Sequence, residues 1–240
     1  MLPSDLRQAE SQALVALHSA LASGEAGRWI VELRFEGLKV LPLALRLAAG
    51  LRERRPALRV LFPDAGAMAL ARRDGGALAP LISSLGDHRR RQVSEPREPD
   101  APEASQTAGE LLLLVRPTPA DYALVEAVCG AHGGPVVLLN PTLEDGAVGI
   151  GSVARARRKG FLAQWREAYA LRPFADSALR RAHPGEWELY RLDPAGFRLA
   201  ACFPQKPSAE EQAAALSGGD GLGLGQQLRS LGDLIDNLQR

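Results

Sequence analysis

Three polar residues stand just behind apolar runs of the sequence, where they could hold a polar ligand. One is an acid, one a fixed cation and one an amide, and such a set can bind and orient a small molecule. The alternative is local structure: an acid that caps the next helix, an amide that turns the chain before proline, and an arginine paired with a nearby acid. The residues are Asp64 after 58–62, Arg116 after 111–115 and Asn140 after 135–139, and Gly66 marks the turn beside the first of them.

A glycine pair, Gly149 and Gly151 in the run Gly-Ile-Gly-Ser-Val-Ala-Arg, is the second candidate. It matches a relaxed dinucleotide fingerprint, but that motif needs its glycines directly at the strand-to-helix turn. Here residues 140–148 intervene, and they include two acids that repel phosphate. A weaker interpretation is an anion site, because Arg155 and Arg158 begin a predicted helix beside backbone N–H groups that the glycines leave open. The alternative is a loop whose arginines are solvated or paired with those acids.

Other catalytic signatures are missing from the sequence. The four histidines lie on different predicted elements, without metal-ligand spacing to cysteine or carboxylate. Neither a nucleophile elbow nor a Walker phosphate-binding run occurs. We expect Cys129 and Cys202 to be buried thiols in a reducing compartment, with a single disulfide as the alternative. We therefore expect no metal and no cofactor. The missing catalytic signatures favour a non-enzymatic protein over an enzyme.

A Rossmann-like α/β sheet would position the candidate residues. Strand and helix signals alternate, and the later strands of this part are apolar at every position, which is typical of strands buried on both faces. This pattern predicts a mostly parallel sheet with helices on both faces. The carboxyl ends of parallel strands share one edge, so the three polar residues should meet there, together with Glu36. Expected strands cover 28–35, 58–62, 111–115 and 135–139, and expected helices cover 4–24, 42–54, 67–72 and 119–131.

The later part of the chain has a different pattern. Three alternating segments, the last two joined by a hairpin at 193–196, predict an antiparallel extension at one side of the sheet. Residues 87–110 are rich in Pro, Glu and Arg, which predicts a mobile surface loop inside a single domain over 1–207. The alternating segments are 167–174, 185–192 and 196–203.

Beyond this domain, the sequence predicts a short helix over 208–216 and then a tethered one. The glycine-rich stretch 217–225 has the composition of a flexible linker. Apolar residues at 3-4-3 spacing then predict an amphipathic helix over 226–240, which either folds back on the domain or docks on a partner. These residues are Leu228, Leu231, Ile235 and Leu238.

Composition narrows the classes of partner and the location. The formal net charge is +1, which argues against a general affinity for nucleic acid or anionic lipid. The start of the sequence turns polar at once, and the longest apolar runs fall far short of the roughly 20 residues that span a bilayer. We therefore expect a soluble protein that stays in the compartment where it is made.

Several stretches, taken together, resemble a known family. The motifs that carry the likeness are Phe-Pro-Asp-x-Gly at 62–66, Leu-Asn-Pro at 139–141 and Gly-x-Gly-x-x-x-Arg at 149–155, in an order that holds over about residues 2–207. They resemble the domain-of-unknown-function 1995 family of cyanobacteria and chloroplasts. Plant relatives in that family include the low-photosystem-II-accumulation 3 protein and a domain fused to a plastid adenylate kinase. The family brings no established catalytic residues to this sequence.

The resemblance implies a photosynthetic host, a cytoplasmic location that can be peripheral to thylakoid membranes, and a helper role. Our leading hypothesis is a non-enzymatic assembly or regulatory factor of photosynthetic complexes such as photosystem II, acting by protein binding through residues 225–240. The alternative is a binding protein or transferase for a phosphorylated small molecule or nucleotide, at the carboxyl ends of the strands.

Overall fold

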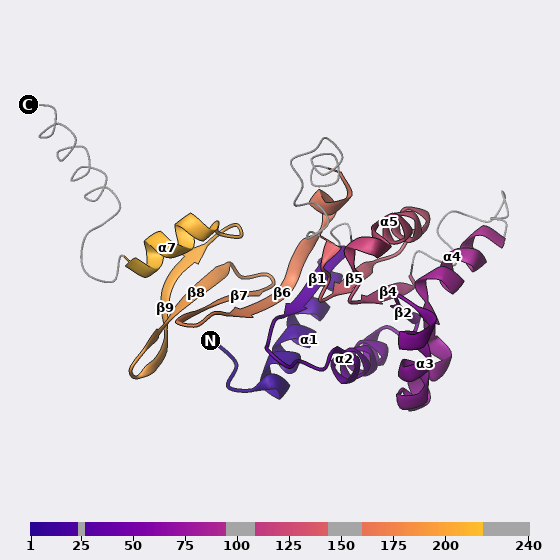
Figure 1. Ribbon diagram of the computed structural model, residues 1–240, viewed down its shortest axis with the longest axis horizontal. Coiled ribbons are helices and arrows are strands. Elements are labelled where there is room, and N and C mark those ends of the chain that lie inside the picture. The colour runs from indigo at the N-terminus through magenta and orange to yellow at the C-terminus, as the bar shows by residue number, and fades with distance from the viewer. Residues whose placement is uncertain (24–26, 95–108, 144–159, 218–240) are drawn as a thin grey trace, which may run out of the picture.

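The computed structural model of the chain describes residues 1–23, 27–94, 109–143 and 160–217. The described strands form one nine-stranded sheet in the order β3-β2-β4-β5-β1-β6-β7-β8-β9 (Figure 1). The strands are β1 Arg28–Leu33, β2 Leu58–Phe62, β3 Ile82–Ser84, β4 Leu111–Val115, β5 Val136–Leu139, β6 Arg166–Pro173, β7 Ser177–Ala182, β8 Trp187–Asp193 and β9 Gly196–Phe203. The helices are α1 Leu6–Ala22, α2 Val40–Arg54, α3 Ala65–Asp74, α4 Leu85–Ser94, α5 Tyr122–Ala131 and α7 Ala209–Ser217, with short 3-10 turns at Gly76–Leu81, Pro119–Asp121 and Phe161–Gln164.

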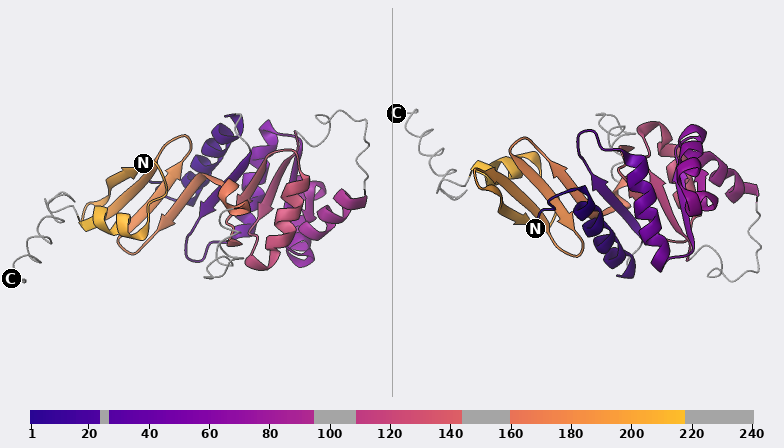
Figure 2. Two further views of the ribbon diagram at one scale, coloured as in Figure 1. Left: turned by 90° about the horizontal axis from the view of Figure 1, so that it is seen from above. Right: turned by 90° about the horizontal axis from the view of Figure 1, so that it is seen from below.

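The first six strands of that order are parallel to their neighbours, which confirms the predicted α/β class. Helices cover both faces of this part, as the two views in Figure 2 show. On one face, α1, α2 and α3 pack on apolar side chains such as Val31 and Val137. On the other face, α5 and the start of α4 pack on the alternate side chains, such as Leu112 and Leu138. Each apolar strand therefore contributes to two cores, which is why its sequence does not alternate.

The antiparallel extension at the end of the sheet is confirmed, with one correction. Strands β7, β8 and β9 are antiparallel to their neighbours, and residues 193–196 join β8 to β9 as predicted. The first of the three alternating segments, β6, instead runs parallel to β1 and only its other edge is antiparallel. Two of the described strands were not predicted from the sequence. β3 has only three residues, and β7 carries Arg180 and Arg181, which donate hydrogen bonds to the carboxylate of Glu188 and the carbonyl oxygen of Glu167.

The prediction of a loop over 87–110 was wrong for its first part. The structure has the helix α4 up to Ser94, although its mean composition is strongly polar. Its start is fixed by Ser84, whose Oγ accepts a hydrogen bond from the backbone N–H of Asp87 at 3.0 Å and donates to the carboxylate of Asp87 at 2.7 Å. Two residues, Leu85 and His88, anchor the helix in the core. A local cap and two buried side chains were enough for a helix that composition alone did not indicate.

The two cysteines differ in their surroundings. Both are free thiols, Cys129 inside α5 and Cys202 on β9. Burial raises the pKa of the Cys129 thiol to about 12. The expectation of two buried thiols was wrong for Cys202, which is exposed because β9 is the last strand of the sheet.

Buried histidines predict a loss of stability in mild acid. Burial lowers the pKa of His88 to about 4, and Arg59 acts in the same direction. The unfolded chain, with a histidine pKa of about 6.5, then binds this proton more readily than the folded chain. This contribution to stability is complete above pH 6.5 and is lost as the pH falls towards 4. We expect the free energy of unfolding to drop by about 3 kcal/mol across that window because of His88.

The measurement is urea denaturation at a series of pH values. His88→Gln should flatten the dependence between pH 6.5 and 4, while leaving the part that comes from His132, whose pKa burial also lowers. A variant that keeps the full slope of the unmodified chain would show that His88 is protonated without cost.

Candidate functional site

The strand order places a topological switch between β1 and β5. These strands are parallel neighbours. From β1 the chain goes on to β2, towards the β3 end of the sheet, whereas from β5 it goes on to β6, towards the β9 end. In open α/β sheets, ligands bind outside the carboxyl ends of the strands at such a point.

A cavity of about 300 Å³ lies at this point, formed by β1, β5 and β6, the residues that follow these strands and the segment that leads into β6. Its size is at the lower end for small-molecule sites. Most of its wall is apolar, and four charged side chains interrupt that wall. The apolar residues are Ile30, Leu138, Leu143, Leu162, Trp165 and Phe174, and the charged ones are Glu32, Arg34, Glu167 and Arg172.

An irregularity in β6 brings two of the charged residues to the cavity. The register between β1 and β6 shifts at Ile30/Val31, so that β6 has one residue more than its partner. Glu167 and Arg172 are separated by an odd number of positions and would point to opposite faces of a regular strand. The extra residue puts both side chains on the cavity side, where β-bulges often redirect a functional residue.

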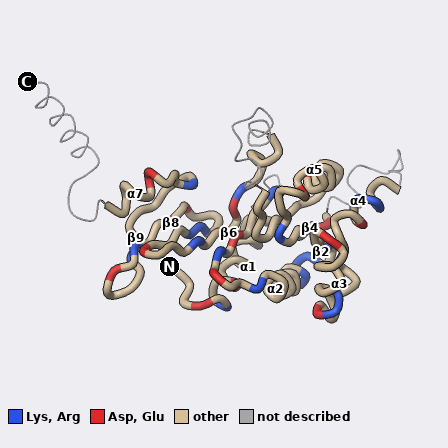
Figure 3. The backbone as a smooth tube through the Cα atoms, in the orientation of Figure 1, with Lys and Arg blue, Asp and Glu red and all other residues tan. Residues whose placement is uncertain are grey.

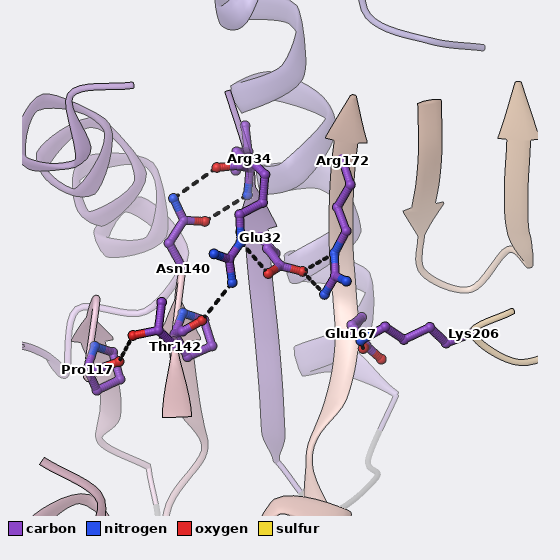
Figure 4. Close-up of polar contacts among 10 residues, drawn as sticks. Glu32, Arg34, Pro117, Asn140, Thr142, Glu167, Arg172 and Lys206 are labelled. Atoms are coloured by element: carbon purple, nitrogen blue, oxygen red, sulfur yellow. Dashed lines mark hydrogen bonds and ion pairs between the residues drawn. The ribbon is translucent and has the colours of Figure 1, made fainter. Parts of the chain in front are cut away.

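Glu32 is the centre of the charged group. Its carboxylate is only 3% exposed, and it accepts hydrogen bonds of 2.6 Å from Nε of Arg34 and of 2.6 Å from Nε of Arg172 (Figure 4). Arg34 also donates to the carbonyl oxygen of Pro141 at 3.0 Å. The two arginines are 45% and 26% exposed. Each guanidinium carries five N–H donors. Both cations therefore keep donors for an anion that enters the cavity.

Trp165 is the second unusual group in the wall. Its side chain is 8% exposed, and its indole N–H has no hydrogen-bond partner among the described residues. The ring makes an edge contact with Phe161, with 5.5 Å between ring centroids, and the guanidinium of Arg28 lies 5.8 Å from its centre. A buried donor without an acceptor is costly unless a ligand or water meets it.

Asn140 positions this site but does not face a ligand. Its Oδ1 accepts from the backbone N–H of Leu33 at 2.7 Å, and its Nδ2 donates to the carbonyl oxygen of Leu33 at 3.0 Å. The amide thus fastens the end of β5 to the end of β1, between Glu32 and Arg34 (Figure 4). Its backbone is left-handed, with φ of 48°, a conformation that asparagine tolerates better than most residues.

The other predicted ligand residues that the structure describes share the edge of the sheet but do not line the cavity. Asp64 caps α3, where its carboxylate accepts from the N–H of Ala67 at 2.8 Å, and Gly66 lies in the first turn of that helix. Arg116 follows β4 with φ of 48°, and its exposed guanidinium makes no hydrogen bond or ion pair within the described residues. The strands before these residues are parallel, so the predicted common edge is confirmed. Gly149, Gly151, Arg155 and Arg158, and the apolar stripe Leu228, Leu231, Ile235 and Leu238, lie outside the described residues.

The charged group that lines the cavity was not predicted from the sequence. One signal was available: Glu32 interrupts the apolar run Trp-Ile-Val-Glu-Leu, and a glutamate in a buried strand is almost always paired. The identity of its partners was not visible, because Arg172 is far away along the chain.

The surroundings of the cavity mix both signs of charge. Acidic and basic positions lie next to each other on the strands around it (Figure 3). Lys206 reaches Glu167 at 3.7 Å between Nζ and Oε1. Within the described part of the chain, no helix has the length and apolar character needed to cross a membrane.

Comparison with known proteins gives a family and no further detail. A family described as a domain of unknown function, DUF1995, matches residues 3–214. No curated protein matches the chain.

Proposed function

The chain belongs to the DUF1995 family, and we propose that it binds a small amphipathic anion in the cavity between β1, β5 and β6. The ligand class is a carboxylate or phosphate attached to an apolar body. One observation carries the proposal: Arg34, directly after β1, and Arg172 of β6 converge on the buried carboxylate of Glu32, and both are partly exposed and keep further N–H donors.

The local charge supports an anion. Arg34 and Arg172 with Glu32 leave an excess of one positive charge, and Lys206 compensates Glu167 beside them. Arginine is suited to such a role because its planar guanidinium meets the two oxygens of a carboxylate or phosphate.

The apolar wall supports a ligand with an apolar body. Six apolar side chains, with Trp165 and Phe174 among them, would contact the part of the ligand behind its charged group. A free inorganic ion would leave this surface unused, so a ligand with a ring or short chain should bind more tightly.

Ligand binding is expected to stabilise the chain against heat. We suggest phenyl phosphate as the probe, with inorganic phosphate and phenol as its two halves. At 100 times the dissociation constant, phenyl phosphate should stabilise the folded state by about 2.7 kcal/mol. The change should be accompanied by a change in the fluorescence of Trp165.

Arg172→Gln should remove most of this stabilisation. Arg198→Gln is the matched control, because Arg198 is also an ion-paired arginine on a strand but does not line the cavity. Equal stabilisation of both variants, or no stabilisation of the unmodified chain by any anion, would contradict the proposal.

A second candidate function is an assembly or regulatory factor of photosynthetic complexes that acts by protein binding. Its support is the family, for which we propose a cyanobacterial host and a cytoplasmic place near thylakoids, and the predicted apolar stripe in 226–240. Deletion of residues 217–240 followed by co-purification with photosystem subunits tests it. Unchanged recovery would remove the stripe from this function.

A further inference from the structure

One face of the last two strands carries an apolar patch. Tyr190 pairs with Leu199 and Leu192 pairs with Phe197 across β8 and β9, so these four side chains share a face. Three of them are exposed, Leu192 at 46%, Phe197 at 46% and Leu199 at 49%. We call these three residues the β9 patch. On this face α1 packs on β6 and β7, whereas α7, which contacts β9, packs on the opposite face.

The opposite face of the same strands is covered by α7. Trp187 and Leu189 alternate with the residues on the face of the patch, and Ala215 and Leu216 of α7 pack against them. Near its end, α7 is also held by Arg191, which donates to the carbonyl oxygen of Leu216 at 3.5 Å. Figure 1 shows α7 beside β9, the edge strand. The chain that follows Ser217 therefore starts next to the edge that separates the two faces.

The next residues are long enough to pass around this edge. Residues 218–225 number eight, of which five are glycine. Fully extended they span at most about 26–29 Å, and as a flexible coil about 15 Å. An element packed on either face lies about 10 Å from the sheet, so elements on opposite faces are about 20 Å apart. The linker therefore reaches the β9 patch when it is partly extended.

We propose that residues 226–240 of this chain pack on the β9 patch. The first reason to propose this segment is its sequence. It carries one apolar stripe at helical spacing, formed by Leu228, Leu231, Ile235 and Leu238. The second reason is that the linker holds this segment close to the patch. A linker of this length gives an effective concentration on the order of 1 mM, which a second copy or another protein seldom reaches. The stripe is then occupied in the free protein, and any partner that uses it must first displace it from the patch.

Cys202 provides a probe for this contact. It pairs with Glu188, which is two positions from Tyr190, so the thiol lies on the face that carries the patch. Cys202 is exposed and Cys129 is buried, so a thiol reagent reacts first with Cys202 in the folded chain. A segment packed on the patch should shield it.

The experiment is the rate at which Cys202 of the full chain reacts with a small aromatic disulfide reagent. With a tether of about 1 mM and an intrinsic dissociation constant of about 0.1 mM, docking slows the reaction about tenfold. The double variant Leu231→Asp and Ile235→Asp should restore the fast rate. Leu199→Asp, which places a charge in the patch itself, should also restore the fast rate. Its thermal unfolding transition serves to check that this variant is folded. Asp233→Asn is the matched control, because residue 233 lies on the opposite side of the predicted helix, and it should leave the rate slow.

Two results would overturn the proposal. One is an equal rate in the unmodified chain and the tail variant, which changes no residue of the folded domain. The other is shielding that grows with protein concentration, because a second copy would then be the occupant. This inference does not depend on the ligand of the cavity, and phenyl phosphate should leave the rate unchanged.

Discussion

Replacing Asn140 with alanine is expected to lower the free energy of unfolding by about 3–5 kcal/mol. The variant leaves the buried N–H and carbonyl of Leu33 without the partners that now lie at 2.7 and 3.0 Å. Each unsatisfied buried group costs about 1–3 kcal/mol. Alanine must also adopt the left-handed backbone at this position, which costs about 1–2 kcal/mol more. Urea denaturation measures the sum.

A glycine at the same position separates the two causes. Asn140→Gly loses the same hydrogen bonds but accepts a positive φ without strain. It should therefore be destabilised less than Asn140→Ala, by about 1–2 kcal/mol. A loss below about 1 kcal/mol in both variants would show that water replaces the amide, and that Asn140 does not fasten β5 to β1.

The sequence predicted the sheet well because its strands are apolar at every position. A run such as Leu111–Val115 has no polar face, so it can only be buried on both sides. The parallel order and the common edge of the strands follow from this pattern and from the helices between them. β3 escaped notice because a strand of three residues has no period to detect. α4 was not predicted because its stability comes from a cap and two buried side chains, which its polar composition does not indicate.

The residues predicted as a ligand site follow strands whose ends share one edge of the sheet, but two of them have another role there. Polar residues at strand ends were chosen as ligand groups, yet Asp64 caps a helix and Asn140 holds two strands together. Arg116 and Asn140 share the same left-handed backbone, and their N–H groups donate to the neighbouring strands, to Leu139 and Val31. These positions turn the chain away from the sheet, and polar residues suit such turns.

The charged group of the cavity could not be predicted from local sequence patterns. Glu32 and Arg172 are 140 positions apart and meet only because β6 lies next to β1. The orientation of Arg172 further depends on the irregularity in β6. A sequence period of two, counted through that strand, would have assigned Arg172 and Glu167 to opposite faces. Contacts of this kind follow from topology and register, which a single sequence does not specify.

Replacing Glu32 with glutamine is expected to change stability and anion binding in opposite directions. The variant loses two charge-assisted hydrogen bonds and leaves Arg34 and Arg172 close together without their anion. Removing one partner from a buried ion pair costs about 3–5 kcal/mol. Because both arginines are partly exposed and can turn to water, we expect the free energy of unfolding to fall by about 2–3 kcal/mol. Urea denaturation without ligand tests this half.

The same substitution should strengthen the binding of phenyl phosphate. The excess positive charge of the group rises by one, because glutamine is neutral. A unit charge about 8 Å away contributes about 1–2 kcal/mol at an effective dielectric constant of 20–40, which corresponds to about tenfold in affinity. Glu188→Gln is the matched control, since Glu188 also holds an arginine, Arg180, but outside the cavity. It should lose stability without gaining affinity. If Glu32→Gln binds phenyl phosphate more weakly than the unmodified chain, then Glu32 orients the arginines for the ligand rather than competing with it.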